Sequence, residues 1–185
     1  MFYDKYYSHV EAILFASGDP LTAEKIAKIL DIPSEHVEDI IFDLKEEFKK
    51  PIHGINIRQV AGGYQFCTKL EVKDTINLLA QNREQKLSQA AMETLAIIAF
   101  KQPITKQEIE FIRGVKSEKI INSLLEIKLI KEAGRKDAVG RPILYATTDE
   151  FLTAFGLNSL RDLPNLPEGI FDEKISEILP ENADE

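Results

Sequence analysis

Residues 12–22 of the chain read AILFASGDPLT, and residues 96–105 read AIIAFKQPIT. Each stretch contains an apolar run, a proline, an aliphatic residue and a threonine, and isoleucines follow four and seven positions after the threonine. This spacing is typical of one face of a helix. Because an internal repeat sets the number of domains, the sequence predicts two copies of one helical unit.

The threonine of each copy is placed to begin a helix. The side chains of Thr22 and Thr105 can accept a hydrogen bond from a backbone N–H of the first helical turn. Glu108 lies three residues after Thr105, which is the spacing of a capping box. A third helix is predicted in each copy, over 34–48 and 117–127, and we expect Ser34 and Ser117 to act as its N-cap.

After each third helix the apolar period changes to two, which indicates strands. In the first copy Ile55 and Ile57 alternate with polar residues, residues 61–63 read AGG and predict a turn, and residues 64–68 alternate again. In the second copy, residues 129–135 and 143–147 predict strands joined by the loop 136–141. The predicted fold class is therefore mainly α with small β-hairpins (α+β), arranged as two tandem winged-helix domains.

The predicted boundaries follow from composition. The wholly polar run QNREQK, residues 81–86, separates an N-terminal domain, 1–84, from a C-terminal domain, 85–156. Short helices over 72–80 and 148–155 are expected to close them. Residues 157–185 hold eight acidic residues, two basic residues and three prolines, so we expect an acidic, partly disordered tail. Its weak apolar stripe fits either a docking helix or a transient one: Phe171, Ile175, Ile178 and Leu179.

The charge of the chain disfavours binding to phosphates as its main role. The net charge is −8, with 10 basic and 14 acidic residues in 1–84 and 11 and 9 in 85–156. Non-specific nucleic-acid affinity depends mostly on lysine and arginine. No apolar run is long enough to span a bilayer, and the single cysteine, Cys67, excludes an internal disulfide. We expect a cytoplasmic protein that does not enter a membrane.

The predicted third helices are poor DNA readers. The helix over 34–48 has six acidic residues and one lysine at its polar positions, and these acids would repel phosphates. The helix over 117–127 is nearly neutral and has no arginine. Direct DNA binding is therefore expected to be weak or absent. Arg135, Lys136 and Arg141 cluster around Asp137, and this hairpin fits a phosphate contact, an acidic protein partner or a solvated turn.

No constellation for catalysis is visible. His9, His36 and His53 have no carboxylate or thiol at ligand spacing, and no glycine-rich phosphate loop is present. We therefore predict a protein that is not an enzyme, with no catalytic, cofactor-binding or metal site. Residues 9–15 and 91–100 are apolar on more than one helical face. Burial in the core accounts for most of these apolar residues. The apolar surface that remains predicts a self-association or partner interface.

Several longer motifs resemble those of the bacterial segregation and condensation protein B (ScpB) family. Near the start, residues 11–18 read EAILFASG, and in the second copy residues 87–105 read LSQAAMETLAIIAFKQPIT. The second copy continues with IRGV at 112–115, GRKD at 134–137 and GRPILY at 140–145. The resemblance covers about residues 8–166, and its motifs are long and in the same order.

The resemblance implies a function that the residue pattern alone does not give. Members of this family are tandem winged-helix proteins that form homodimers, chiefly through the first domain, and bind the kleisin subunit ScpA. The kleisin bridges the heads of an SMC ATPase dimer, and the complex organises and segregates the chromosome. An alternative from another class is a dimeric winged-helix DNA-binding transcriptional regulator. The family's second-domain motifs point to six partner-binding residues here: Arg113, Gly114, Arg135, Arg141, Pro142 and Tyr145.

Overall fold

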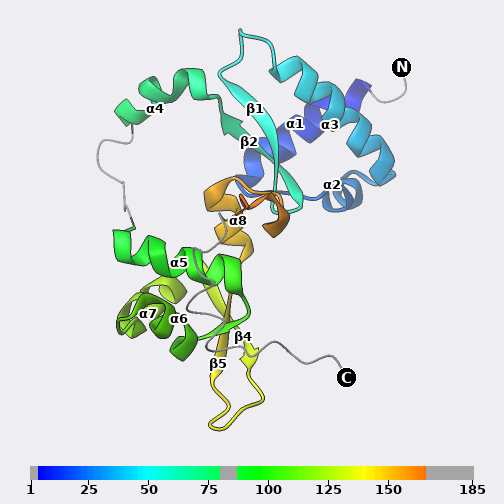
Figure 1. Cartoon of the computed structure of the whole chain (residues 1–185). Coiled ribbons are helices and arrows are strands. Elements are labelled where there is room, and N and C mark those ends of the chain that lie inside the picture. The colour runs from blue at the N-terminus through cyan, green and yellow to red at the C-terminus, as the bar shows by residue number, and fades with distance from the viewer. Residues whose placement is uncertain (1–3, 80–86, 166–185) are drawn as a thin grey trace. The chain divides into compact units, whose positions relative to one another are not determined.

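The structure, a computed structural model, describes residues 4–79 and 87–165 of the 185-residue chain. The chain divides into two compact units, Met1–Gln85 with Gly156–Ser159, and Lys86–Phe155 with Leu160–Glu185 (Figure 1). Helices and small antiparallel sheets make up both units, so the predicted fold class is confirmed. The predicted linker, 81–86, and the acidic tail from residue 166 onward, with its apolar stripe, lie outside the described residues.

The first unit begins with three helices, α1 Asp4–Ser17, α2 Ala23–Leu30 and α3 Ser34–Phe48. The predicted cap of α2 is confirmed, because the Thr22 side chain accepts a hydrogen bond from the Lys25 N–H at 3.3 Å. The predicted Ser34 cap is wrong. The N-cap of α3 is Pro33, whose backbone is extended, and Ser34 is already the first helical residue.

A two-stranded hairpin follows, β1 Ile55–Val60 and β2 Gly63–Thr68. Val60 pairs with Gly63, so Ala61 and Gly62 alone form the turn, and Gly63 belongs to the strand and not to the turn as predicted. Ala61 and Gly62 have φ angles of 49° and 75°. Two positive φ angles are typical of the type I′ turn, whose twist matches that of the strands.

The hairpin is held to the start of α2 by a short β-bridge. The Leu21 N–H donates to the Tyr64 carbonyl at 3.0 Å, and the Tyr64 N–H donates to the Leu21 carbonyl at 2.7 Å. The backbones are so close that a Cβ on Gly63 would lie 2.8 Å from the carbonyl carbon of Leu21. Glycine is therefore required at this position.

Two further segments complete the first unit. A 3₁₀ turn, Leu70–Val72, leads into α4, Lys73–Leu79. The distant segment Gly156–Ser159 meets the hairpin, where Leu157 O accepts from the Ala61 N–H at 2.9 Å and the Asn158 side chain accepts from the Gly62 N–H at 3.0 Å. The hydrogen bonds satisfy backbone donors at the turn.

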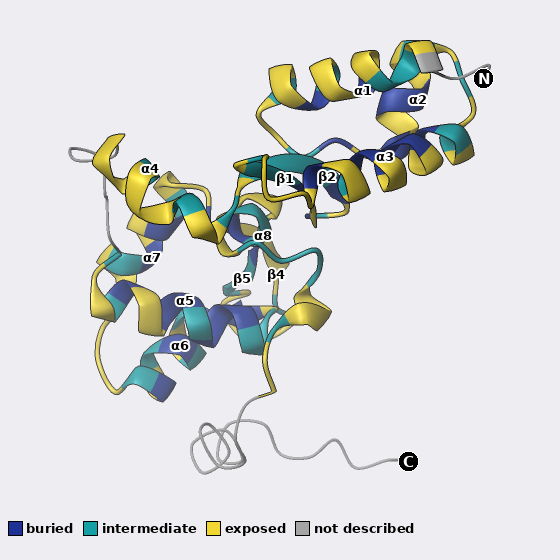
Figure 2. Ribbon diagram, turned by 90° about the horizontal axis from the view of Figure 1, so that it is seen from above, coloured by how far each residue is buried: buried dark blue, intermediate teal, exposed yellow. Residues whose placement is uncertain are grey.

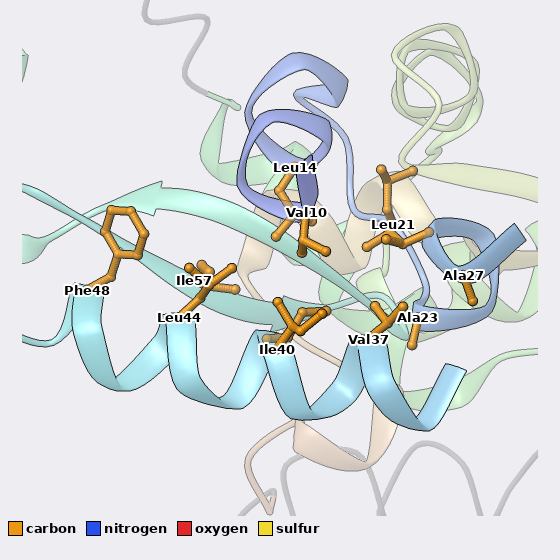
Figure 3. Packing of buried hydrophobic residues seen from close by; sticks show 12 residues of the cluster. Val10, Leu14, Leu21, Ala23, Ala27, Val37, Ile40, Leu44, Phe48 and Ile57 are labelled. Atoms are coloured by element: carbon orange, nitrogen blue, oxygen red, sulfur yellow. The ribbon is translucent and has the colours of Figure 1, made fainter. Parts of the chain in front are cut away.

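The core of the first unit lies between α1, α2, α3 and the hairpin. Figure 3 shows Val10 and Leu14 of α1 above Ile40 and Leu44 of α3. Ile26 of α2 completes this cluster and is fully buried. Burial of a side chain of this size stabilises a fold by roughly 1.5–3 kcal/mol. The apolar spacing of the helices is thus explained by one shared core.

The second unit repeats this order of elements. Its three helices are α5 Gln89–Lys101, α6 Lys106–Arg113 and α7 Glu118–Glu126. The strands are β3 Ile104–Thr105, β4 Ile130–Arg135 and β5 Ile143–Thr147, in the sheet order β3-β5-β4. Helix α8, Asp149–Phe155, and a 3₁₀ turn, Leu160–Asp162, follow. Strand β3 was not predicted, since two residues are too few to show a period.

Of the first three helices of the second unit, side chains cap two, α5 and α6. Ser88 caps α5 by accepting from the Ala91 N–H at 3.2 Å. The predicted capping box is confirmed, since Thr105 accepts from the Glu108 N–H and its own N–H donates to the Glu108 carboxylate. The predicted N-cap position of Ser117 in α7 is confirmed, but its side chain does not form a capping hydrogen bond. The Ser117 hydroxyl accepts from Arg113 and donates to the Val115 carbonyl instead.

The buried positions of the second unit lie on all three helices, the hairpin and α8. Figure 2 shows that much of α5 is buried, in contrast to the mostly exposed α1. Within residues 4–79 and 87–165, no helix combines the length and apolar character needed to cross a bilayer. The large buried side chains of this unit include Leu95, Ile98, Ile109, Ile121, Leu124, Ile130 and Phe151.

Candidate partner-binding site

The loop between β4 and β5, residues 136–142, has a defined backbone. The Lys136 N–H donates to the Pro142 carbonyl at 2.9 Å, and the Arg141 N–H donates to the Ala138 carbonyl at 2.8 Å. Nη1 of Arg135 donates to the Arg141 carbonyl at 3.1 Å. Arg141 has a φ of 42°, a conformation that costs a residue other than glycine about 1–2 kcal/mol. Arg135, the last residue of β4, and Arg141 of the loop are therefore neighbours, and both are exposed.

An ion pair anchors this loop to the start of α6. Nζ of Lys136 lies 2.6 Å from Oε1 of Glu108, the residue that also forms the capping box with Thr105. Burial raises the pKa of the Glu108 carboxyl, but the hydrogen bonds from Lys136 and Thr105 together outweigh burial, so the pKa lies below its ordinary value. Glu108 is therefore ionised at neutral pH and ties loop and helix together.

A pocket of about 370 Å³ lies between the hairpin, α6 and α7. Its floor contains Ile121, which is 1% exposed, and Tyr145, which is 7% exposed. The volume falls in the range of roughly 300–1,000 Å³ that is usual for ligand pockets. The full lining is Lys106, Gln107, Glu118, Ile121, Asn122, Arg135, Pro142, Ile143 and Tyr145.

The polar groups of this pocket carry both charges, with an excess of positive charge. Nζ of Lys106 lies 3.5 Å from the carboxylate of Glu118, so these two charges offset each other. Among the described residues, no carboxylate forms an ion pair with Arg135. Burial is the main cause of the raised pKa of Tyr145, with Glu132 and Glu118 adding to it and Lys106 opposing it. The Tyr145 hydroxyl thus stays protonated at neutral pH.

Arg113 and Gly114 lie at the turn between α6 and α7 and not in the pocket lining. The side chain of Arg113 is only 8% exposed, and its Nη1 donates to the Ser117 hydroxyl at 2.8 Å while Nη2 lies 3.5 Å from Glu93 of α5. Gly114 ends α6 with a φ of 73° and donates its N–H to the Glu110 carbonyl at 2.8 Å. Both residues therefore have a structural part in joining the three helices.

The structure thus brings together some of the residues predicted from the sequence. Arg135, Arg141, Pro142 and Tyr145 all lie on the β4–β5 hairpin, and three of them line the pocket. Lys106 was not predicted as a site residue. Its position directly after the Thr105 cap could have indicated that it lies at the start of α6. The remaining lining residues that were not selected are Gln107, Glu118, Ile121, Asn122 and Ile143.

The corresponding region of the first unit has a different surface. Burial raises the pKa of Tyr64 in β2, and the charged neighbours that add to this are the acids Glu38 and Glu24. Phe15 of α1 is 77% exposed and Phe42 of α3 is 63% exposed. Figure 2 shows exposed residues along the outer sides of both helices. Six exposed acids accompany Phe42 on α3: Glu35, Glu38, Asp39, Asp43, Glu46 and Glu47.

Over the parts of the chain that the structure describes, no group of three or more His, Cys, Asp or Glu side chains is arranged to hold a metal ion. His53 packs against Phe48 with ring centroids 4.8 Å apart, which gives it a packing role.

The known proteins that are similar to this chain carry the name of one family. Residues 8–166 match the family model described as segregation and condensation complex subunit ScpB. A segregation and condensation protein B from Brevibacillus brevis is 51% identical over 169 residues, which cover 90% of this chain and 87% of that protein. The corresponding protein from Ruminiclostridium cellulolyticum is 45% identical over 177 residues, with 95% and 93% covered.

Two solved structures are also similar to the chain. The crystal structure of ScpB from Mycobacterium tuberculosis is 31% identical, covers 83% of this chain and 96% of that chain, and has a TM-score of 0.40. The crystal structure of a dimer of the ScpB N-terminal domain complexed with a ScpA peptide is 26% identical, covers 43% and 99%, and has a TM-score of 0.41.

Proposed function

The chain belongs to the segregation and condensation complex subunit ScpB family, and from this we propose that it is a non-catalytic scaffold subunit of a bacterial SMC–kleisin complex. In this role it forms a homodimer and binds the kleisin subunit ScpA. Through the kleisin it associates with the SMC ATPase, which supplies ATP hydrolysis. The protein acts in the cytoplasm and reaches the nucleoid as part of the complex.

The observation that best supports this proposal is the exposed surface of α3. In a DNA-binding winged helix, this third helix enters the major groove and meets phosphates. Here it exposes six acids and Phe42. Acids repel the phosphate backbone, whereas an exposed aromatic side chain favours contact with protein. The first unit is therefore suited to binding protein.

Dimerisation is assigned to the first unit, residues 1–84. Phe15 and Phe42 are large apolar side chains exposed on its helices, and aromatic residues are enriched at protein interfaces. Kleisin binding is assigned to the second unit, residues 85–156, through the β4–β5 hairpin. Of the six candidate residues, Arg135, Arg141, Pro142 and Tyr145 are the direct contacts, and Arg113 and Gly114 shape the domain that presents them.

The experiment is light scattering after size exclusion, on the chain alone and after mixing with ScpA from the same cell. We expect the mass of two chains, which rises by a whole kleisin on mixing. The double variant Phe15→Glu, Phe42→Glu should shift the mass toward one chain, because two buried carboxylates disfavour an apolar interface. The matched control is Lys25→Glu, Lys28→Glu on α2, which should leave the dimer intact.

Two outcomes would overturn the proposal. One is a wild-type chain that stays monomeric and ignores ScpA. The other is tight binding to a single DNA duplex with a steep loss of affinity in salt, which is the behaviour of the dimeric transcriptional regulator. Either result would leave the fold unchanged and remove the scaffold function.

A further inference from the structure

We propose that the pocket between α7 and the β4–β5 hairpin receives one large apolar side chain of an acidic peptide segment, with a carboxylate of that segment bound by Lys106 and Arg135. The inference rests on the proposed function, since the segment belongs to the kleisin. It adds the chemistry that the bound segment must have.

The floor of the pocket is apolar and is therefore complementary to an apolar side chain. Ile121 and Tyr145 are almost fully buried, and Ile143 and Pro142 extend the same apolar lining. A hydrophobic group that enters such a site removes apolar surface from water at about 25 cal/mol per Å². Binding anchors of protein interfaces commonly sit in pockets of this kind, surrounded by polar contacts that exclude water.

The basic residues at the rim of the pocket are complementary to a carboxylate next to that apolar side chain. Lys106 and Arg135 lie on the rim, and the only acidic residue among the lining residues is Glu118, which already pairs with Lys106. Arg135 is exposed and bonds only a backbone carbonyl among the described residues, so further guanidinium N–H groups remain for a ligand. An acidic segment is therefore complementary in charge.

The amide side chains of the lining suit the backbone of a bound peptide. Gln107 and Asn122 are exposed at the rim, and each provides both a donor and an acceptor. A bound segment can thus pair its own N–H and carbonyl groups while its apolar side chain is buried.

The first unit rejects the same segment. Tyr64 corresponds to Tyr145, because each tyrosine pairs with the aliphatic residue that precedes a capping threonine, Leu21 or Ile104. Besides burial, the pKa of Tyr64 is raised by the charges of two nearby acids, Glu38 and Glu24. Like charges disfavour an acidic ligand at this position, so the segment binds one unit of each chain.

The test is the Kd for intact ScpA, measured by calorimetry with the full-length chain. Lys106→Glu, Arg135→Glu is expected to weaken binding by at least about ten-fold, because it replaces attraction by repulsion at the carboxylate. The control is Lys119→Glu, Lys131→Glu, which changes the net charge equally at exposed positions of the same unit outside the pocket lining. The control is expected to stay within about two-fold.

A second variant tests the apolar part. Ile143→Gln places a polar side chain in the apolar lining and should also weaken binding by about ten-fold, a loss typical of one anchor contact. Hydrogen exchange of α5 and α7 verifies that the domain is folded. Changing acidic residues of ScpA to lysine one at a time should identify one that restores binding to Lys106→Glu, Arg135→Glu.

The outcomes separate this inference from the proposed function. If wild-type chain does not bind ScpA, the proposed function fails. If wild type binds and the pocket variants bind equally well, the function stands and the pocket is wrong. If the control variant weakens binding as much as the pocket variant, only net charge matters, and the proposed pocket is also wrong.

Discussion

The two units share their inward-facing positions and differ in their outward-facing ones. Leu21 and Tyr64 form a bridge in the first unit, and Ile104 and Tyr145 form the same pairing in the second. Ile26 and Ile109 occupy equivalent positions in the second helix of each unit, and both are fully buried. The surfaces diverge, with acids and exposed phenylalanines on one unit and a pocket with a basic rim on the other. A shared core therefore constrains a repeated fold, while its surface is free to acquire a different partner.

The hairpins show the same divergence in their turns. Ala61 and Gly62 alone connect the strands of the first unit, which leaves no room for an extended wing. Residues 136–142 connect those of the second and carry Arg141. The longer loop needs its own anchor, and the ion pair between Lys136 and Glu108 supplies it. A longer wing is thus coupled to the helix cap beneath it.

Truncation of a core isoleucine should destabilise its unit strongly. Ile26→Ala and Ile109→Ala each leave a cavity at a fully buried site and should cost about 2–5 kcal/mol of stability in their own unit. Hydrogen exchange followed by mass spectrometry reports each unit separately. The exposed control Lys28→Ala should stay within about 0.5 kcal/mol. If each isoleucine change destabilised both units equally, they would unfold together, and treating them as two independent folds would be wrong.

The helix caps should show a smaller difference between the units. Thr22→Ala removes the capping hydrogen bond from the Lys25 N–H and should cost about 1 kcal/mol, whereas Thr105→Ala disrupts a reciprocal capping box and should cost up to about 2 kcal/mol. Urea unfolding at neutral pH measures both losses of stability, and hydrogen exchange shows which unit is affected. Equal costs would show that the capping box adds nothing beyond a single cap.

The cost of Thr105→Ala should also depend on pH. The pKa of Glu108 is lowered in the folded state, so its stabilisation is present above the ordinary value of 4.5 and is lost as pH falls through the lowered pKa. Acidification should therefore bring the two threonine variants closer together. In a Glu108→Gln background this convergence should disappear, and a convergence that persisted there would assign it to another carboxyl group.

The pKa values of the two paired tyrosines should change only slightly when nearby charges are removed. Glu24→Gln, Glu38→Gln should lower the pKa of Tyr64, because both acids raise it. Lys106→Gln should raise the pKa of Tyr145, because Lys106 lowers it. NMR of the tyrosine ring resonances across alkaline pH measures the direction of each pKa shift. Glu46→Gln on the outer side of α3 serves as the control. Shifts of the same sign would contradict the charge difference between the units.

Much of the fold is accessible from the sequence because it depends on local patterns. The period of apolar residues predicts the helices and hairpins, and the spacing of Thr105 and Glu108 predicts a capping box. Ser34 is not the N-cap of α3, and Ser117 is the N-cap of α7 without a capping hydrogen bond, for reasons that lie outside local sequence. Pro33 takes the position before α3, and the Ser117 hydroxyl is drawn into contacts with Arg113 and Val115.

The candidate site was less accessible, because it combines residues that are distant along the chain. The arginines of the hairpin belong to recognisable motifs, but Lys106 and Glu118 meet them only through the packing of α6 and α7. Arg113 shows the opposite error. Its motif suggested an outward contact, whereas the structure buries it between Ser117 and Glu93. Tertiary contacts, which no local pattern specifies, decide both cases.

The segment Gly156–Ser159 has a consequence for the order in which the protein is made. It belongs to the first unit, where Leu157 and Asn158 accept hydrogen bonds from the Ala61 and Gly62 N–H groups. A ribosome synthesises the hairpin long before it reaches these partners. The unit that is translated first is therefore completed last, after all three helices of the second unit have been translated.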